Sequence, residues 1–173
     1  MKKQYIVTGT VLLLFGLLVG NCSGSITRVD GITAPNYSEV KIGDGITMTY
    51  SDEAKGEVKA SGVIDEGALL NVLKGRLIKS GLYADAGTTT IELKVTSARF
   101  RSEFTAFFWG IFAGSDSMEI ELFVRDKSGK VIDRHTMTMS YGAGGLMGTN
   151  ANRQAWFHTK IVELAMEQLE VEN

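Results

Sequence analysis

Cysteine and proline are nearly absent from the sequence, which has one residue of each among its 173 residues. A single cysteine cannot form an intrachain disulfide, so outside a reducing compartment the fold would depend on core packing alone. Hydrophobic residues make up 44% of the chain, and no segment has the composition of a disordered region. The sequence therefore predicts one compact domain with its own core.

An excess of one charge is missing as well. The net charge is −2, and lysine and arginine form no cluster interleaved with aromatic residues, so we expect no nucleic-acid partner. The two histidines, His135 and His158, lack the spacing of a zinc site, and no G-x-S-x-G motif is present. We therefore expect no metal, no cofactor and no enzymatic activity.

The one long run without charge lies at the N-terminus. Lys2 and Lys3 precede the uncharged residues 6–20, and Cys22 follows them closely. This is the layout of a signal peptide. The run is shorter than the about 20 residues that a membrane-spanning helix needs, which disfavours an uncleaved anchor.

The end of this run, LLVGNC, resembles the lipobox of bacterial lipoproteins, in which the cysteine receives the lipid and becomes the first residue. Val19 stands where leucine is most usual and Asn21 where a small residue is usual, and the looser lipobox of spirochaetal lipoproteins accommodates such a residue. The resemblance implies a cleaved signal peptide at residues 1–21 and lipid attachment at Cys22. The alternative is a signal peptide followed by an unmodified cysteine.

Small and polar residues, with the only proline at Pro35, dominate residues 23–37 and show no sustained periodicity. We expect residues 22–37 to be the lipidated N-terminus and a tether, and residues 38–173 to be a single domain. Ser23 differs from the aspartate that resembles an inner-membrane retention signal in enteric bacteria. The outer membrane is therefore expected, with the domain facing the periplasm or the cell surface.

The domain opens with two short strands and a helix. Residues 38–42 and 45–52 are typical of strands, separated by a Gly-Asp-Gly turn. A helix follows after Asp65, which can cap its start, and Gly81 can close its end. Its apolar residues recur at helical spacing, at Leu69, Leu73 and Leu77.

Three strands are expected next, at residues 88–101, 117–126 and 130–140, because apolar and polar residues alternate there. A tight turn at Ser128 and Gly129 joins the last two strands, whereas a bulge at Gly129 would shift the pairing by one residue. The two-residue turn predicts three apolar cross-strand pairs: Leu122 with His135, Ile120 with Met137, and Met118 with Met139.

An amphipathic helix is expected from about residue 151 to residue 170, with Thr149 or Asn150 as its cap. The element order is strands, helix, three strands, helix. The predicted fold class is α+β, with an antiparallel or mixed sheet of about four to five strands packed by two helices.

The stretch FTAFFWGIFAGSDS, residues 104–117, is the most apolar part of the chain outside its first twenty residues. The hairpin directions require this segment and the glycine-rich residues 141–148 to lie at the same end of the sheet. The two segments either pack on each other and cover that end, or form an exposed interface for a membrane or a partner. The candidate interface residues are Phe107, Phe108, Trp109, Phe112 and Met147.

The second half, residues 91–169, resembles a family of bacterial lipoproteins of unknown function. The resemblance rests on a Gly-Ala-Gly type loop, a strand, an Asp-x-x-Gly-Lys-Val turn and a second strand, matched here by residues 113–114, 118–126 and 129–131. Bulky aromatic residues make the loop heavier than is usual in that family. The resemblance brings no known catalytic residue.

Two functions stay open from the sequence. The first is a lipid-anchored cell-envelope protein with a non-catalytic interaction, assembly or integrity role, which has the membrane and an envelope protein as partners. The second is an envelope module that binds a lipid, a glycan or a small anion at the glycine-rich end, where Arg153 lies near the start of a helix.

Overall fold

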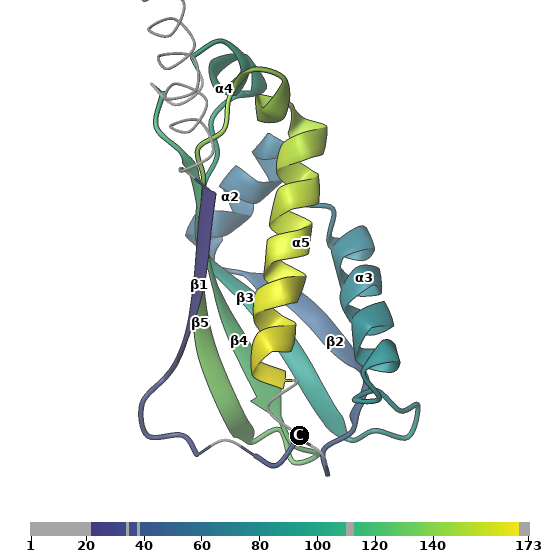
Figure 1. Ribbon diagram of the computed structural model, residues 1–173. Coiled ribbons are helices and arrows are strands. Elements are labelled where there is room, and N and C mark those ends of the chain that lie inside the picture. The colour runs from purple at the N-terminus through teal and green to yellow at the C-terminus, as the bar shows by residue number, and fades with distance from the viewer. Residues whose placement is uncertain (1–21, 34, 38, 110–112, 170–173) are drawn as a thin grey trace, which may run out of the picture.

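The computed structural model describes residues 22–33, 35–37, 39–109 and 113–169. These residues form a five-stranded sheet with strand order β1-β5-β4-β3-β2, and the longer helices lie on one face of it (Figure 1). The expected α+β class is confirmed. The strands are β1 (Cys22–Arg28), β2 (Ile42–Tyr50), β3 (Thr89–Arg99), β4 (Asp116–Arg125) and β5 (Val131–Tyr141). The helices are α2 (Asp52–Ser61), α3 (Glu66–Lys79), α4 (Glu103–Trp109), the short 3-10 helix η2 (Gly145–Gly148) and α5 (Asn150–Leu169).

The sheet is mixed, because β2 runs parallel to β3 while the other neighbouring strands are antiparallel. The central hairpin of β4 and β5 has the predicted register from Asp116 to Val124, but the expected two-residue turn is wrong, because Asp126 is bonded to Lys130 and Arg125 pairs with Val131. A register shift between Val124 and Arg125 restores the predicted pairs. Gly129 in its turn has φ 83°, a left-handed conformation that glycine adopts without strain. The confirmed pairs are Leu122 with His135, Ile120 with Met137, and Met118 with Met139.

Helices α3 and α5 are the two that the sequence predicted, and both pack on the sheet. The Asp65 side chain caps α3 by accepting a hydrogen bond from the Ala68 amide at 2.9 Å. Among the described residues, no helix is long and apolar enough to cross a membrane. The buried face of α3 consists of Leu69, Leu73 and Leu77, and that of α5 includes Phe157, Ile161, Leu164, Ala165 and Leu169.

The region before α3 differs from expectation. In place of two short strands at 38–42 and 45–52 joined by a Gly-Asp-Gly turn, one strand, β2, runs through the expected turn from Ile42 to Tyr50, with a register shift between Ile42 and Ile46. Helix α2 was not predicted, because only Ala54 and Val58 of its residues are buried and they give a weak apolar repeat. Its start is fixed by the side chain of Ser51, which accepts a hydrogen bond from the Ala54 amide at 3.1 Å.

The expected tether at 22–37 is wrong in its first part, since Cys22–Arg28 forms the edge strand β1 paired with β5. Residues on one side of β1 are half-buried and those on the other are exposed, but several of the half-buried residues are small or polar, so the alternation is hard to see in the sequence. Gly24 lets α5 approach closely, because a Cβ there would lie 2.8 Å from Lys160 and 3.3 Å from Leu164. Strand β1 is therefore an integral part of the domain.

A buried carboxylate fastens β1 and the segment after it to β5. Asp133 accepts hydrogen bonds from the Tyr37 hydroxyl at 2.8 Å and from Arg28 Nη2 at 3.2 Å, and His135 Nε2 lies 3.0 Å away. Burial alone raises the pKa of Asp133, but His135 and Tyr37 together lower it below its ordinary value. These contacts explain why Asp133 is tolerated in the buried layer.

A histidine connects α5 with the start of α3. The Asp65 amide donates a hydrogen bond to His158 Nε2 at 3.2 Å, so this nitrogen must be unprotonated in the folded protein. Burial lowers the pKa of His158 below its ordinary value of 6.5, against the charge of Asp65, which raises it. His158 therefore binds a proton more readily in the unfolded chain than in the folded protein. Its contribution to the free energy of unfolding is fully present above pH 6.5 and is lost as pH falls through the lower pKa that His158 has in the folded protein.

The His158→Gln variant keeps a side-chain acceptor and removes this titration. We expect its free energy of unfolding to change less than that of the wild type between about pH 7 and about pH 5. Urea denaturation at a series of pH values measures the difference. An identical pH dependence in both proteins would show that His158 does not contribute to the pH dependence of stability.

Candidate interaction surface

The aromatic segment, expected to be a loop, begins with the helix α4. The Ser102 hydroxyl accepts a hydrogen bond from the Thr105 amide at 3.1 Å, which is the arrangement of a helix N-cap. Aromatic residues are mediocre helix formers, and a helix this short shows too few turns for its period to be recognised. The helix lies at the end of the sheet where β3 finishes and β4 begins (Figure 1).

Helix α4 packs against the glycine-rich segment, as the predicted hairpin requires. Ala106 is fully buried, and Gly148 of η2 lies against it so closely that a Cβ at Gly148 would be 2.6 Å from the Ala106 carbonyl oxygen. The Tyr141 hydroxyl holds η2 from below by donating a hydrogen bond to the Met147 carbonyl oxygen at 2.5 Å. The prediction that the two segments meet at one end of the sheet is confirmed.

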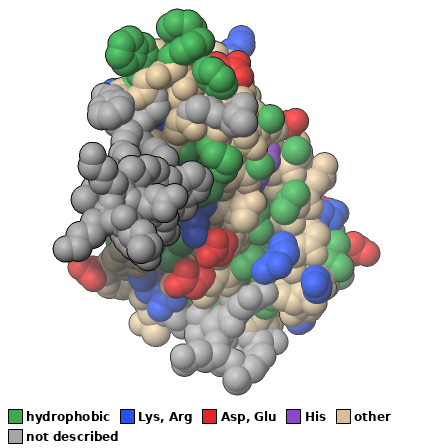
Figure 2. Space-filling view, turned by 45° about the horizontal axis from the view of Figure 1, so that its top comes forward, with side chains coloured by type: hydrophobic (Ala, Val, Ile, Leu, Met, Phe, Trp, Pro, Cys, Tyr) green, Lys and Arg blue, Asp and Glu red, His purple; other side chains and the backbone are tan. Residues whose placement is uncertain are grey.

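The side chains of α4 other than Ala106 largely point outward. We call the exposed apolar residues of α4 and η2 the aromatic cap, and hydrophobic side chains gather at this end of the molecule, at the top of Figure 2. Phe108 stacks near Phe104 with ring centroids 4.6 Å apart. Phe112 lies outside the described residues. The cap consists of Phe104 (66% exposed), Phe107 (38%), Phe108 (65%), Trp109 (62%) and Met147 (56%).

Charge is nearly absent from the cap. Glu103 is the only ionisable residue of α4, and its carboxylate accepts a hydrogen bond from the Asn150 amide at 3.3 Å, at the start of α5. A contiguous group of exposed aromatic side chains without charge is the usual mark of a membrane or protein interface. The cap is therefore the candidate interaction surface.

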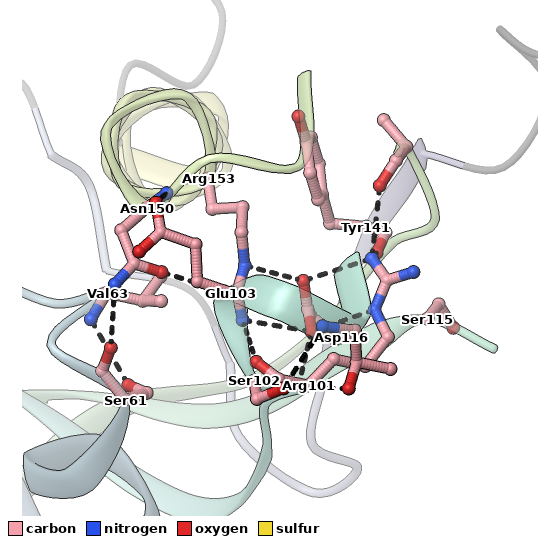
Figure 3. A network of polar contacts seen from close by, with 12 residues as sticks. Ser61, Val63, Arg101, Ser102, Glu103, Ser115, Asp116, Tyr141, Asn150 and Arg153 are labelled. Atoms are coloured by element: carbon pink, nitrogen blue, oxygen red, sulfur yellow. Dashed lines mark hydrogen bonds and ion pairs between the residues drawn. The ribbon is translucent and has the colours of Figure 1, made fainter. Parts of the chain in front are cut away.

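Beneath the cap lies a fully buried carboxylate between two buried guanidinium groups (Figure 3). Asp116, the first residue of β4, accepts hydrogen bonds from Arg101 Nε at 3.2 Å and from Arg153 Nε at 2.9 Å. It also accepts one from the Arg101 amide at 2.7 Å. One side chain thus joins the end of β3, the start of β4 and helix α5.

Besides Asp116, the two arginines donate hydrogen bonds to backbone carbonyls and to an amide oxygen. Arg101 Nη2 donates to the carbonyl oxygens of Tyr141 at 3.0 Å and Ala143 at 3.2 Å, at the start of the glycine-rich segment. Arg153 Nη2 donates to the Arg101 carbonyl oxygen at 2.8 Å, and Arg153 Nη1 donates to Asn150 Oδ1 at 2.8 Å. The network therefore fixes both segments that carry the cap.

Sequence reasoning did not single out Arg101 or Asp116. A signal was present, because Asp116 occupies the same face of the alternating strand as Met118 and Ile120, a position where a lone carboxylate needs partners. Arg153 was considered as part of an anion site at the glycine-rich end. In the structure its side chain is 1% exposed and bound to Asp116, so its role is structural.

The histidines of the sequence lie away from the cap and from each other. His135 is buried beside Asp133 at the β1 side of the sheet, and His158 contacts the start of α3. In the parts of the chain that the structure describes, no three histidine, cysteine or acidic side chains are grouped so that they could hold a metal ion.

A domain of unknown function, DUF4410, is found at residues 70–145. This range contains β3, α4, β4 and β5, and hence both Arg101 and Asp116.

Among solved structures, the chain is similar to a PelC dodecamer from Paraburkholderia phytofirmans, with 14% identity and a TM-score of 0.49 over 87% of this chain and 100% of that chain. A second PelC dodecamer, a point variant from the same organism, gives 13% identity and a TM-score of 0.47 over the same shares. No curated protein sequence matches the chain.

The Asp116→Asn variant removes the negative charge between the two buried guanidinium groups. Because breaking a buried ion pair leaves uncompensated charge, we expect a loss of about 3–5 kcal/mol in the free energy of unfolding. Urea denaturation measures this loss.

The control is Asp44→Asn, which breaks an exposed ion pair with Lys74 and should leave stability nearly unchanged. Equal effects of the two substitutions would contradict the structural role of Asp116.

Proposed function

We propose that the protein is a lipid-anchored cell-envelope protein, attached to the outer membrane through Cys22, with a non-catalytic interaction role. In this proposal the aromatic cap rests on the membrane that holds the anchor, and the rest of the domain remains available to an envelope protein partner. The observation that carries the proposal is the pairing of Cys22 with Tyr141, at the end of the sheet that bears the cap.

Strand pairing supports this arrangement, because it puts Cys22 at the end of the sheet that bears the cap. Cys22 pairs with Tyr141, and Tyr141 pairs with Asp116 on its other side. Strand β3 lies next to β4, and α4 follows the end of β3. Three strand spacings separate β1 from β3, which amounts to roughly 15 Å.

The absence of a spacer between Cys22 and the sheet supports an orientation. Cys22 is the first residue of β1, and β1 is held by its pairing with β5, by Gly24 against α5, and by Arg28 on Asp133. A lipid on Cys22 would therefore hold this end of the domain at the bilayer surface. A flexible tether would have allowed any orientation.

The composition of the cap suits an interfacial position. Phenylalanine and tryptophan rings are favoured at the membrane interface, and each apolar side chain that becomes fully buried contributes roughly 1.5–3 kcal/mol. Several half-exposed side chains would together add to the anchoring by the lipid. No charge on α4 other than Glu103, which is already hydrogen-bonded, opposes the contact.

The Cys22→Ala variant tests the anchor. Cells grown with a radioactive fatty acid should label the wild-type protein, and the variant should carry no label and leave the membrane fraction. The domain should still fold, because alanine is compatible with the first position of an edge strand. An unlabelled wild-type protein would remove the lipoprotein proposal.

The orientation of the cap is tested by tryptophan fluorescence, since Trp109 and Trp156 are the only tryptophans. In the lipidated full chain with Trp156→Phe, Trp109 should be quenched strongly by vesicles of phospholipid with brominated acyl chains. The matched control, Trp109→Phe, leaves the half-buried Trp156 and should show much weaker quenching.

Adding Phe108→Asp to the Trp156→Phe chain should keep the circular dichroism spectrum and reduce the quenching of Trp109, because the charge opposes insertion. If Trp109 is not quenched by lipid but becomes protected when an envelope extract is added, the cap binds a protein instead of the membrane. If Phe108→Asp unfolds the domain, the cap is part of the core.

A further inference from the structure

A concave surface separate from the cap lies between α2 and the beginning of α3. It is a half-open cleft of about 370 Å³ beside the end of β2. This volume is within the range of small-molecule sites, which are usually about 300–1,000 Å³. Its lining consists of Tyr50, Lys55, Val58, Lys59, Gly62, Ile64 and Glu66.

The floor of the cleft is apolar. Val58 is buried in the core, and Ile64 and Tyr50 are half-buried and pack against it. Gly62 turns the chain from α2 toward α3 with φ 62°, and no atom lies within 4 Å of the position that a Cβ would take. A left-handed glycine thus ends the helix and leaves the cleft open.

The rim of the cleft is positive. Lys55 and Lys59 are one turn apart on α2, and neither forms an ion pair with any residue that the structure describes. Like charges at this spacing destabilise a helix by a few tenths of a kcal/mol. An anion bound between the two ammonium groups would remove that repulsion.

The one acid in the lining is already engaged. Glu66 accepts a hydrogen bond from the Tyr50 hydroxyl at 3.1 Å. Burial, together with the charge of Glu66, raises the pKa of the Tyr50 phenol, which therefore stays protonated and keeps donating. Two lysines against one carboxylate leave the cleft with an excess positive charge.

We infer that this cleft binds a small amphiphile with one anionic group and a short apolar body, of which a medium-chain fatty acid is the simplest example. The anionic group lies between Lys55 and Lys59, and the apolar body covers Val58 and Ile64. The site is independent of the proposed membrane contact, because it shares no residue with the aromatic cap.

The test uses the full chain in lipid nanodiscs and a medium-chain fatty acid that carries a photoactivatable diazirine at its apolar end. After illumination, mass spectrometry of peptides should find the label within residues 50–66. Octanoate should compete with the probe, whereas octylamine and acetate should not, because the first has the wrong charge and the second lacks the apolar body.

The double variant Lys55→Met and Lys59→Met keeps helix-forming side chains and should lower labelling of residues 50–66 about tenfold, since each charge-assisted contact contributes about 1 kcal/mol or less at an exposed site. The matched control is Lys79→Met, which removes the same charge at the far end of α3 and should label like the wild type. Labelling confined to residues 103–109, equal competition by octylamine, or equal labelling of all variants would overturn the inference. None of these outcomes depends on whether Trp109 contacts lipid.

Discussion

The end of the domain that carries the cap depends on the ion pairs of the Asp116 carboxylate with Arg101 and Arg153. A two-layer fold of one sheet and a few helices buries its apolar faces well, but the ends of its strands carry unpaired backbone groups. Here two guanidinium groups, held in place by a single carboxylate, supply donors to the carbonyl oxygens of residues 101, 114, 141 and 143. The exposed helix α4 and the glycine-rich segment are therefore attached to the sheet by hydrogen bonds and not by an apolar core of their own.

The parts of the fold that could be predicted are those where apolar residues repeat with a clear period. Strand β4 alternates over ten residues, and α3 places leucine at every fourth position, so a single arrangement buries each set. The pairing at the centre of the hairpin was predicted correctly, although the expected two-residue turn was not, because a register shift between Val124 and Arg125 compensates for the longer turn. From these elements alone it could be deduced that the aromatic and glycine-rich segments meet.

The parts that could not be predicted depend on contacts between segments far apart in the sequence. Strand β1 has small and polar residues, and its place is set by Gly24 against α5 and by Arg28 on Asp133. The exposure of the aromatic residues depends on Gly148. Its backbone packs against α4 at Ala106, the one residue of this helix that is buried. No local pattern contains that information, because it concerns the space between two backbones.

The edge position of β1 also has a consequence for the order in which the domain is assembled. Cys22 and Tyr141 are partners in the sheet although about 120 residues separate them in the chain, and closing so large a loop is entropically unfavourable until β5 is already formed. The first residues of the domain to be synthesised are therefore among the last to be paired. Until the β4–β5 hairpin has formed, the segment around Cys22 has no strand to pair with. It is then accessible to enzymes that act on peptides.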